Sequence, residues 1–324
     1  MNPLVSIIVA CYNKERYVQE TIDSVLNQSY QNWELIIVDD KSSDETASVL
    51  FNKKNNDSRI KISLNDVNKG ANFCRNTGLL NAKGKYIIFL DADDLLIKTC
   101  LEKRTSIIEK EDLDFCVFTM GVFKNTLGDM YYKWIPNSKQ PLHDFLSHKL
   151  PWAIIQPIWK KELLVKLNGF DESFKRLQDV ELHTRVLFLD NINYKLIIDT
   201  PDCYYRIDED RKNFNTYDFL DRWVHSSILY FNKFYKVSIN KDMLNLLNGT
   251  ILNTYLQIIY NYKKGQLTRK EFNDLEKKIV NNKIEVPLNK YTLFLLRLAK
   301  LYNLHSFRIT GINWFINKLI CMKI

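Results

Sequence analysis

The residues best suited to chemistry are three aspartates, Asp91, Asp93 and Asp94, which follow the apolar residues 86–90. The apolar run predicts a buried strand. Three carboxylates at its end add no stability of their own, because like charges repel and resist burial. A divalent cation would resolve this conflict, since Mg²⁺ and Mn²⁺ bind carboxylate oxygens and commonly keep substrate phosphates as further ligands. The alternative is a solvated acidic turn.

Strand and helix patterns alternate along the first part of the chain. Apolar runs predict strands at residues 4–11, 33–40 and 86–91, and the alternating residues 60–65 predict a further strand. Apolar residues at helical spacing predict a helix at residues 15–27, the N-cap candidates at 42–44 predict one at about 44–54, and Gly70 is expected to open one that ends at about residue 82. This order predicts an α/β fold with a doubly wound, mostly parallel sheet. Such sheets bind ligands at the carboxyl ends of their strands, where the aspartates are expected.

Glycine-rich phosphate loops are missing from the sequence. No Gly-x-Gly-x-x-Gly follows the first expected strand, and no Gly-Lys-Ser/Thr motif occurs. A bound nucleotide would therefore be held by acidic residues and a metal ion instead of a glycine cradle.

The chain resembles family 2 glycosyltransferases with the GT-A fold over residues 3–94. The resemblance lies in VSIIVACYNKERYVQETIDSVLNQSYQNWELIIVDDKSSDET and then NKGANFCRNTGLLNAKGKYIIFLDADD. It resumes at residues 169–185, GFDESFKRLQDVELHTR, and fades after about residue 210. It implies a Rossmann-like GT-A domain, a nucleotide-sugar donor, in the first place a UDP-sugar, and Mn²⁺ or Mg²⁺ as cofactor.

The resemblance also implies a donor site. Asp40 matches the acid that accepts a hydrogen bond from the uracil N3–H, and Asp39 and Glu15 are expected beside it. Lys69 and Arg75 match residues near the ribose and the diphosphate; the alternative is that both are surface charges at a helix start.

Further donor-site residues are implied at two strand ends. Asp91 matches the acid near the ribose, and Asp93 matches the metal ligand, with Asp94 as an adjacent acid. The remaining matches are expected to line the donor, and they are Pro3, Ser6, Ala10, Tyr12, Asn13 and Ala92.

A second acidic position lies at the expected start of a later helix. The family carries a Glu-Asp pair there, and its Asp is the general base; in this chain the pair is Gln178-Asp179. The resemblance therefore implies Asp179 as the catalytic base of an inverting displacement, without the preceding Glu. The alternative is that Asp179 only caps the helix.

The middle of the chain, residues 95–168, is expected to form the acceptor side. Residues 114–120 and 129–134 predict strands. Aromatic faces suit sugar rings, although buried core aromatics are more common. The candidates are Tyr131, Tyr132, Trp134, Trp152 and Trp159. His183 is expected to be structural, and Asp208 stands where many relatives of the family have His.

Cysteine usage and hydropathy indicate the compartment. Six cysteines lie far apart without a Cys-x-x-Cys pair, which argues against a zinc site or a disulfide framework and fits a reducing cytosol. The sequence shows neither a secretion signal nor an uncharged apolar run of about 18 residues. We therefore expect a cytoplasmic protein.

Charge separates two regions of the chain. Residues 1–210 are expected to be the GT-A domain, with a nucleotide-sugar half at 1–94 and an acceptor half at 95–210, and they hold 27 Lys and Arg against 31 Asp and Glu. Residues 211–324 hold 19 against 7, and their helical spacing predicts an all-helical region with helices at 216–237, 242–262, 268–281 and 291–304.

The last 38 residues, 287–324, contain six Lys or Arg and no acid, interleaved with large apolar residues. This composition favours docking on the inner face of the cell membrane, near a lipid-linked acceptor. The alternative is a packed helical subdomain or a dimer face. Nucleic-acid binding is not expected, because the basic residues are scattered and no reader motif occurs.

Three functions remain open at this point. The leading one is an inverting, metal-dependent hexosyl- or N-acetylhexosaminyltransferase that acts on a glycan or lipid-linked acceptor in bacterial capsule, O-antigen or exopolysaccharide synthesis. A sugar nucleotidyltransferase should show a glycine-rich basic loop after the first strand, which YNKERY is not. A non-catalytic glycan-binding or scaffold protein would tolerate the loss of Asp93 and Asp179, yet both are present.

Overall fold

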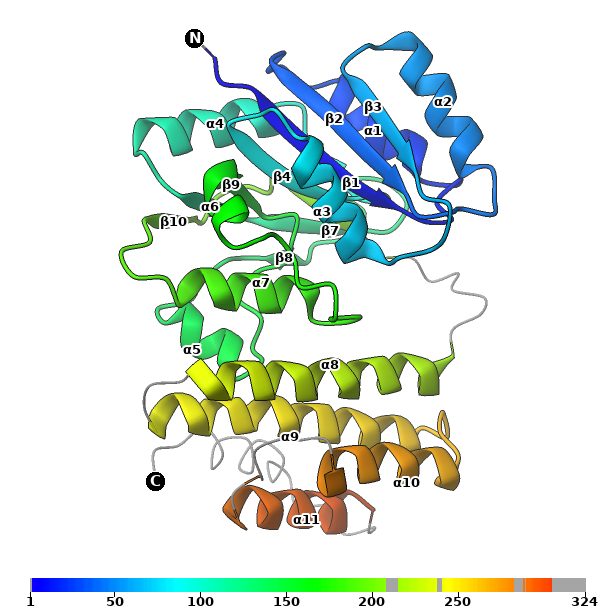
Figure 1. Ribbon diagram of the computed structural model, residues 1–324, viewed down its shortest axis with the longest axis vertical. Helices are drawn as coiled ribbons and strands as arrows, with labels where there is room; N and C mark the ends of the chain where they lie inside the picture. Colours follow the sequence, from blue (N-terminus) through cyan, green and yellow to red (C-terminus); the bar gives the residue numbers. More distant parts are fainter. Residues whose placement is uncertain (1, 208–214, 238–240, 283–287, 289, 305–324) are drawn as a thin grey trace. The chain divides into compact units, whose positions relative to one another are not determined.

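A computed structural model, shown in Figure 1, describes residues 2–207, 215–237, 241–282, 288 and 290–304. The chain divides into two units. The first unit takes in residues 1–139, 151–172 and 185–210, and the second takes in 140–150, 173–184 and 211–324. A division into domains at residue 210 stays a prediction.

The main sheet of the first unit has seven strands in the order β10-β6-β9-β4-β1-β2-β3. Its parallel part is formed by β1 (Val5–Cys11), β2 (Trp33–Asp39), β3 (Ile60–Leu64) and β4 (Tyr86–Asp91). β9 (Pro157–Lys160) is antiparallel to both β4 and β6 (Phe115–Phe118), and β10 (Tyr194–Ile197) is parallel to β6. The expected α/β class with a mostly parallel sheet is confirmed.

Helices cover this sheet. They are α1 (Val18–Leu26), α2 (Thr46–Asn56), α3 (Ala71–Asn81), α4 (Cys100–Lys110) and α6 (Lys161–Lys166). α1 begins three residues later than predicted, because residues 15–17 form a turn before it. α3 lies directly on β1: a Cβ added at Gly78 would come within 2.3 Å of Ile8 Cγ2, so only glycine permits this approach.

A second, four-stranded sheet has the order β5-β11-β7-β8. Its strands are β5 (Leu95–Leu96), β7 (Met120–Phe123), β8 (Lys133–Trp134) and β11 (Cys203–Arg206). The single strand predicted at 114–120 is therefore wrong in detail, since β6 and β7 belong to different sheets and Thr119 separates them. The strand predicted at 129–134 is reduced to the two residues of β8.

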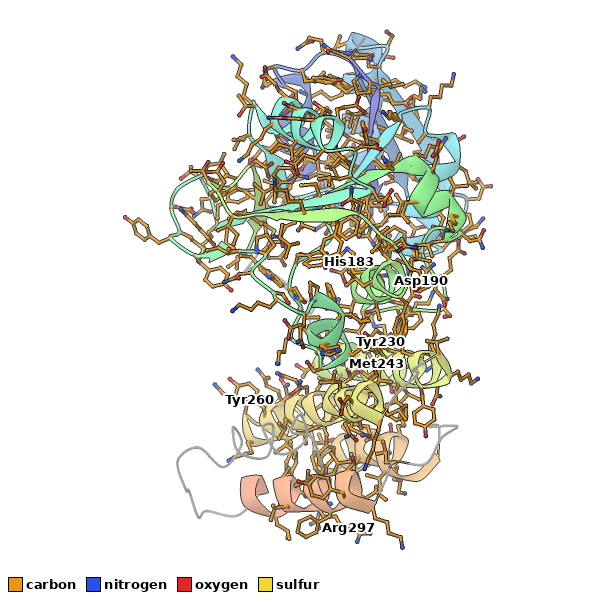
Figure 2. The ribbon with its side chains drawn as sticks, turned by 90° about the vertical axis from the view of Figure 1, so that its left-hand side faces the viewer. His183, Asp190, Tyr230, Met243, Tyr260 and Arg297 are labelled. Carbon is orange, nitrogen blue, oxygen red and sulfur yellow. The ribbon has the colours of Figure 1, made fainter. Side chains whose placement is uncertain are left out.

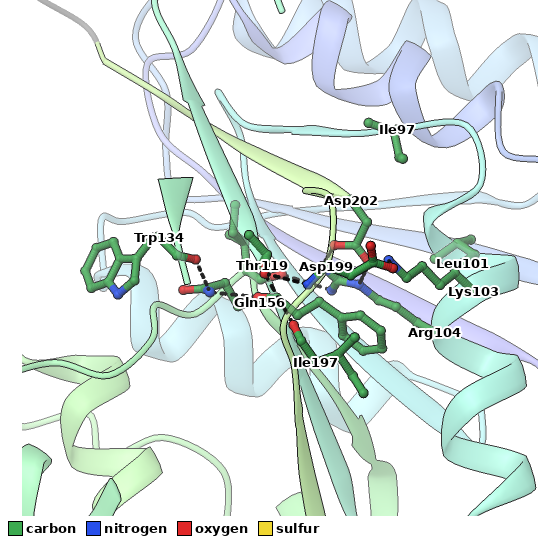
Figure 3. Close-up of polar contacts among 12 residues, drawn as sticks. Ile97, Leu101, Lys103, Arg104, Thr119, Trp134, Gln156, Ile197, Asp199 and Asp202 are labelled. Carbon is green, nitrogen blue, oxygen red and sulfur yellow. Dashed lines mark hydrogen bonds and ion pairs between the residues drawn. The ribbon is translucent and has the colours of Figure 1, made fainter. Parts of the chain in front are cut away.

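A buried ion pair connects α4 to the turn before β11 (Figure 3). Arg104 and Asp202 are both 0 % exposed, and the guanidinium binds the carboxylate through Nε at 2.9 Å and Nη2 at 2.6 Å. Arg104 Nη1 also donates to the carbonyl of Ile155 at 3.0 Å. Beside it, the Gln156 amide donates to the carbonyls of Phe118 and Trp134. Burial of an ion pair costs desolvation free energy, so such a pair is tolerated only where its hydrogen bonds are satisfied.

The second unit is helical in the part that the structure describes. Its main helices are α8 (Thr216–Val237), α9 (Lys241–Lys263), α10 (Arg269–Lys277) and α11 (Lys290–Leu304), with a π-helical turn, η1 (Lys278–Asn282), after α10. These helices match the predicted ones closely, because their apolar residues recur at helical spacing. α5 (Pro141–Leu146) packs on α9, where Thr250 donates to the carbonyl of Leu146 at 3.0 Å.

α7 (Gln178–Leu187) spans the boundary between the two units. Its first part is anchored in the second unit, where Thr184 and Tyr230 hydroxyls are 2.7 Å apart and Glu181, 0 % exposed, pairs with Lys233. His183 is buried in this region beside Phe145 (Figure 2), and burial lowers its pKa to about 3. The expectation that His183 is a structural residue fits this placement.

No helix among the described residues is both long enough and apolar enough to cross a membrane. The five cysteines of that part of the chain, Cys11, Cys74, Cys100, Cys116 and Cys203, are buried free thiols. Asp208 and residues 305–324, to which sequence predictions refer, lie outside the described residues.

Candidate active site

Three parallel strands of the main sheet end at the same level. Ala10 of β1 pairs with Val38 of β2 and with Asp91 of β4, and the next pair is Cys11 with Asp39. The chain therefore leaves β1, β2 and β4 at one edge of the sheet, the carboxyl edge at which open α/β sheets bind ligands. The expected donor residues at the ends of these strands are brought together by this register.

The loops after β1 and β2 are linked by hydrogen bonds. Asn13, whose φ is 50°, accepts from the Ser43 N–H at 2.8 Å and donates its own N–H to Ser42 Oγ at 2.9 Å. The Glu15 carboxylate accepts from the Glu45 N–H at 2.9 Å. Asn13 and Glu15 therefore shape the loops at this edge, whatever further contacts they make to a ligand.

Asp40 is held by the chain itself. It is 3 % exposed, and its carboxylate accepts from the backbone N–H groups of Lys69 at 2.8 Å and Gly70 at 2.7 Å and from the side chain of Asn65 at 2.8 Å. Gly70 has a φ of 93°, which favours glycine, and this conformation directs its N–H to Asp40. Burial alone would raise the pKa of Asp40, but these hydrogen bonds outweigh burial and lower the pKa below its usual value.

Asp39 is bound in the same manner by Ser42. Its carboxylate accepts from the Ser42 N–H at 3.0 Å and from the Ser42 hydroxyl at 2.5 Å. Both acids that end β2 thus have hydrogen-bond donors from their own and neighbouring loops, and these bonds fix the shape of the loop at residues 40–43.

The acids that end β4 are bound by side-chain cations instead. Asp91 Oδ1 accepts from Arg75 Nη2 at 2.8 Å, and the guanidinium of Arg75 lies 5.4 Å from the ring centre of Phe170. Asp93 Oδ2 forms an ion pair with the ammonium of Lys14. Arg75 is only 7 % exposed, so the alternative that it is an ordinary surface charge is wrong. Lys69 is exposed, and its ammonium lies 4.2 Å from the ring centre of Phe73.

Asp94 differs from the two acids before it. It is 0 % exposed, and its Oδ1 accepts from the Arg206 N–H at 2.9 Å. Burial, together with the charges of Asp91 and Asp93, raises the pKa of Asp94 well above its usual value. The alternative of a fully solvated acidic turn is therefore wrong for Asp94.

Two cations at this edge were not predicted as site residues. Lys14 follows β1, and the only sequence signal for it was its position next to Tyr12-Asn13. Arg206, 4 % exposed, donates from Nε to the carbonyl of Asp93 at 3.0 Å and from Nη2 to Glu20 at 2.7 Å. Its guanidinium also lies 4.3 Å from the ring centre of Phe123. Arg206 thus holds the backbone of the acidic turn in place.

The oxygen atoms at the end of β4 fit a hard divalent cation. Asp93 has a partly exposed carboxylate, 17 % by side chain, and its neighbour Asp91 is 33 % exposed. No group of three His, Cys, Asp or Glu side chains placed to hold a metal ion occurs in the described ranges. Mg²⁺ needs only one or two carboxylates when substrate phosphates and water complete its ligands. Asp91 and Asp93 both present such oxygens, and the choice of Asp93 as the residue that would hold an ion together with a diphosphate stays a prediction.

Asp179, the residue expected to act as the catalytic base, belongs to the second unit. Asp179 lies in the first turn of α7 and is half-buried, and its Oδ1 accepts from the Val180 N–H at 2.9 Å. A carboxylate is stabilised at a helix N-terminus by the exposed N–H groups there. The role of Asp179 as a base stays a prediction, and a capping contact does not exclude it.

Several other candidates have structural roles. Ser6 lies at the amino-terminal half of β1, is 0 % exposed and donates to Glu34 at 2.6 Å, so its expected place beside the nucleotide is wrong. Trp152 and Trp159 are each 1 % exposed and pack in the core around Phe115, so neither can stack on a sugar. Trp134 donates from Nε1 to the carbonyl of Pro151 at 3.2 Å.

Two of the aromatic candidates stay available to a ligand, since Tyr131 is 98 % and Tyr132 62 % exposed. On the donor side, Tyr12 is 48 % exposed, Ala10 is half-buried and Ala92 is 2 % exposed. Pro3 precedes the amino end of β1, opposite the carboxyl edge, so its expected place beside the nucleotide is wrong; its carbonyl accepts a hydrogen bond from the Tyr30 hydroxyl at 2.5 Å.

Comparison with known proteins agrees with this geometry. The model of the glycosyl transferase family 2 matches residues 6–161. The putative glycosyltransferase EpsE of Bacillus subtilis is 30 % identical over 220 residues, which cover 67 % of this chain and 77 % of EpsE. The chain therefore belongs to glycosyl transferase family 2.

A second relative shares a shorter region. It is the UDP-Glc:alpha-D-GlcNAc-diphosphoundecaprenol beta-1,3-glucosyltransferase WfgD of Escherichia coli, 43 % identical over 122 residues. These residues cover 38 % of this chain and 47 % of WfgD, so the chain spans about half the length of this curated relative.

Two solved structures share the fold. TarS 1–349 of S. aureus in complex with UDP has a TM-score of 0.63 at 19 % identity, covering 92 % of this chain and 87 % of TarS 1–349. The mannosyltransferase PcManGT of Pyrobaculum calidifontis, in complex with GDP-Man and Mn²⁺, has a TM-score of 0.57 at 16 % identity, covering 99 % of this chain and 85 % of that one. These similarities confirm the GT-A fold with additional C-terminal helices.

Proposed function

We propose that this protein transfers a sugar from a nucleotide-diphosphate donor, a UDP-sugar, to a hydroxyl of a glycan or lipid-linked acceptor. The observation that carries the proposal is the set of acids at the shared carboxyl edge of β1, β2 and β4, with Asp93 partly exposed among them. The relative WfgD is by name a UDP-Glc:alpha-D-GlcNAc-diphosphoundecaprenol glucosyltransferase, which supports a UDP-sugar donor and a lipid-linked acceptor. We infer a place in bacterial surface polysaccharide synthesis from this relative.

In this proposal the residues have distinct tasks. The loops of Tyr12, Asn13 and Asp40 face the nucleotide base, and Arg75 and Lys69 face the ribose and diphosphate. A divalent ion, Mn²⁺ or Mg²⁺, would supply Lewis-acid neutralisation of the departing diphosphate when it is bound at Asp93. Mn²⁺ accompanies GDP-Man in PcManGT, which supports a metal of this kind.

Asp179 would take the proton from the acceptor hydroxyl as that oxygen attacks the anomeric carbon. A positioned base of this kind contributes about 10²–10⁴-fold to the rate. A single displacement inverts the configuration at the anomeric carbon, so no second carboxylate has to form a covalent intermediate. We propose hexosyl or N-acetylhexosaminyl transfer, with the donor sugar to be found by experiment.

The decisive experiment measures donor binding and transfer separately. UDP-sugars are screened by thermal stabilisation with Mn²⁺, and the stabilising donor is then tested for transfer by the wild type and by Asp179→Asn. We expect Asp179→Asn to retain the donor affinity and to lose transfer by about 10²-fold or more. Loss of both to the same extent would mean that Asp179 is only a helix cap. A wild type that binds no nucleotide sugar with Mn²⁺ would refute the proposal in favour of a non-catalytic role.

We further propose that the protein works at the inner membrane face. Within α11, Phe294, Leu298 and Leu301 are 57 %, 37 % and 58 % exposed and lie at helical spacing on one stripe. Arg297 (Figure 2) and Lys290 are exposed on the same helix. Apolar residues beside basic ones suit an anionic bilayer surface, where each basic residue contributes about 1 kcal/mol.

Vesicle co-sedimentation tests the membrane proposal. The variant with Phe294→Gln and Leu298→Gln should bind anionic vesicles less than the wild type, and both proteins should bind more weakly at high salt because the basic residues are screened. Tyr260→Gln, which changes an aromatic residue of α9 that is 55 % exposed, is the matched control (Figure 2). Equal vesicle binding by all three proteins would refute docking through α11.

A further inference from the structure

The two cations that bind the acids of β4 differ in how firmly they are held. Arg75 has 9 % of its side chain exposed, pairs with Asp91 and lies near the Phe170 ring, so its guanidinium is fixed by packing. Lys14 has 30 % of its side chain exposed and reaches Asp93 by a flexible four-carbon stem. Of the two cations, Lys14 is the one that can move.

The backbone of Lys14 is nevertheless fixed. Its N–H donates to Thr46 Oγ1 at 2.8 Å, and its carbonyl accepts from the N–H of Val18 at 2.9 Å. Asp93 is equally fixed, because its carbonyl accepts from Arg206 Nε. Exchange at this pair therefore needs movement of side chains only, while the backbones of Lys14 and Asp93 stay in place.

The carboxylate that Lys14 binds is the one that fits a metal ion. An ammonium and a divalent cation on the same partly exposed carboxylate repel each other, so the two compete for Asp93. When a metal is bound, the diphosphate beside it becomes the strongest anion within reach of the displaced ammonium. Lysine is well suited to this contact, since it binds phosphates as a point charge from several directions.

We propose that Lys14 is a positioning residue that exchanges partners: it binds Asp93 before the metal arrives and binds the donor diphosphate afterwards. The identity of the diphosphate in this inference rests on the proposed function, whereas the competition between Lys14 and the metal ion for Asp93 does not. In the metal-free protein Lys14 neutralises Asp93 and keeps the acidic turn in its binding geometry. With donor and metal present, it adds a positive charge to the leaving group.

The test uses two ligands, for which opposite effects are expected. Binding of Mn²⁺ alone is measured by electron paramagnetic resonance of the free ion, and binding of UDP is measured by calorimetry at saturating Mn²⁺, because the exchange places Lys14 on the diphosphate only when the metal is bound. Lys14→Met should bind Mn²⁺ about fivefold more tightly, because its competitor is gone, and UDP about fivefold more weakly; fivefold is the effect of one partly exposed ion pair. Lys14→Gln serves as a second neutral variant in case Lys14→Met folds poorly.

Two controls separate this role from a structural one. Lys14→Arg keeps the charge and should resemble the wild type on both ligands. Lys85→Met removes the ammonium that pairs with Glu109 at 2.5 Å, next to the amino end of β4, and should change neither affinity. A change of both affinities in the same direction, or an unchanged Mn²⁺ affinity in Lys14→Met and Lys14→Gln, overturns the exchange.

The same experiment keeps the two proposals apart. A wild type that fails to bind UDP even with Mn²⁺ refutes the proposed function, whereas the Mn²⁺ measurement still decides whether Lys14 competes for Asp93. Conversely, a wild type that binds UDP with Mn²⁺, together with a Lys14→Met variant whose Mn²⁺ affinity is unchanged, leaves the proposed function intact and refutes only the exchange.

Discussion

The strands β2 and β4 both end in neighbouring aspartates, yet the structure neutralises the two sets differently. Asp39 and Asp40 after β2 accept hydrogen bonds from backbone N–H groups, a serine hydroxyl and an asparagine amide. Asp91 and Asp93 after β4 bind the side-chain cations of Arg75 and Lys14. The same pattern in the sequence therefore produces one set of acids held by uncharged hydrogen-bond donors, mostly backbone N–H groups, and one set held by side-chain cations.

This difference predicts different functions for the two strand ends. Hydrogen bonds from the backbone can be lost only if the loop itself changes shape, so the end of β2 would be a fixed part of the proposed donor site. A side-chain cation can leave its carboxylate without any change of the backbone. The end of β4 is therefore the place where an added cation can be exchanged for one of the protein's own.

The largest expected effect is on transfer by Asp93→Asn. We expect the Mn²⁺-dependent rate to fall by about 10²–10³-fold, the size typical of removing one electrostatic group that acts in the transition state. Donor turnover is measured with and without Mn²⁺, and Asp112→Asn, which changes an acid 89 % exposed in the same unit, serves as the control. A near-wild-type rate in Asp93→Asn would contradict the proposal that the end of β4, unlike the end of β2, binds the metal ion.

A smaller effect is expected on stability at the other strand end. Asp40→Asn should lower the free energy of unfolding by about 1.5–3 kcal/mol, because the new NH₂ group cannot accept from the N–H of Lys69 or Gly70. Asp93→Asn should lower it by less than about 1 kcal/mol, since it removes only a partly exposed ion pair. Urea denaturation measures the unfolding free energy of both variants. Equal losses in Asp40→Asn and Asp93→Asn would contradict the proposed difference between the two strand ends.

The contribution of Asp40 should also depend on pH. Its folded-state pKa is lowered, so its stabilising effect is fully present above its unfolded-state pKa of about 3.9 and is lost as pH falls through the folded-state value. The difference in unfolding free energy between wild type and Asp40→Asn should therefore be constant near pH 7 and shrink below about pH 4. If this difference grew as the pH fell, it would contradict the lowered folded-state pKa of Asp40.

The smallest effect is expected at Ser42. Ser42→Ala removes the hydroxyl that donates to Asp39 and accepts from the Asn13 N–H, at a cost of about 0.5–1.5 kcal/mol in unfolding free energy. Ser43→Ala is the matched control, since the Ser43 hydroxyl lies 3.4 Å from Asn13 Oδ1 and contributes little. Equal losses of unfolding free energy in Ser42→Ala and Ser43→Ala would show that the Ser42 hydroxyl stabilises this loop no more than the Ser43 hydroxyl does.

The sequence predicted the fold and the strand ends well, for a physical reason. Buried strands such as β4 need unbroken apolar residues, and the helices of the second unit need apolar residues at helical spacing. Both patterns are local, so a single sequence is enough to detect them. Asp91 and Asp93 were singled out because acids at the end of an apolar run conflict with burial, whereas Asp40 was implied by the family resemblance.

Other features depend on contacts between distant residues and leave no local pattern. The ion pair of Lys14 with Asp93 joins residues 79 positions apart, and that of Arg104 with Asp202 joins residues 98 apart. Trp152 and Trp159 were possible sugar platforms because a sequence does not show which aromatic residues are buried. The break at Thr119 between β6 and β7 was missed because both strands are apolar and consecutive.

The close contact between Gly78 and Ile8 has a consequence for protein engineering. Gly78 lies one helical turn after Arg75 on α3, so the contact that fixes the helix against β1 also fixes the register of the guanidinium at Asp91. Substitutions on this face of α3 should therefore be poorly tolerated in a mutational library. A search for variants with altered donor preference would gain more from randomising exposed positions such as Tyr12 and Lys69, where the chain has room for new side chains.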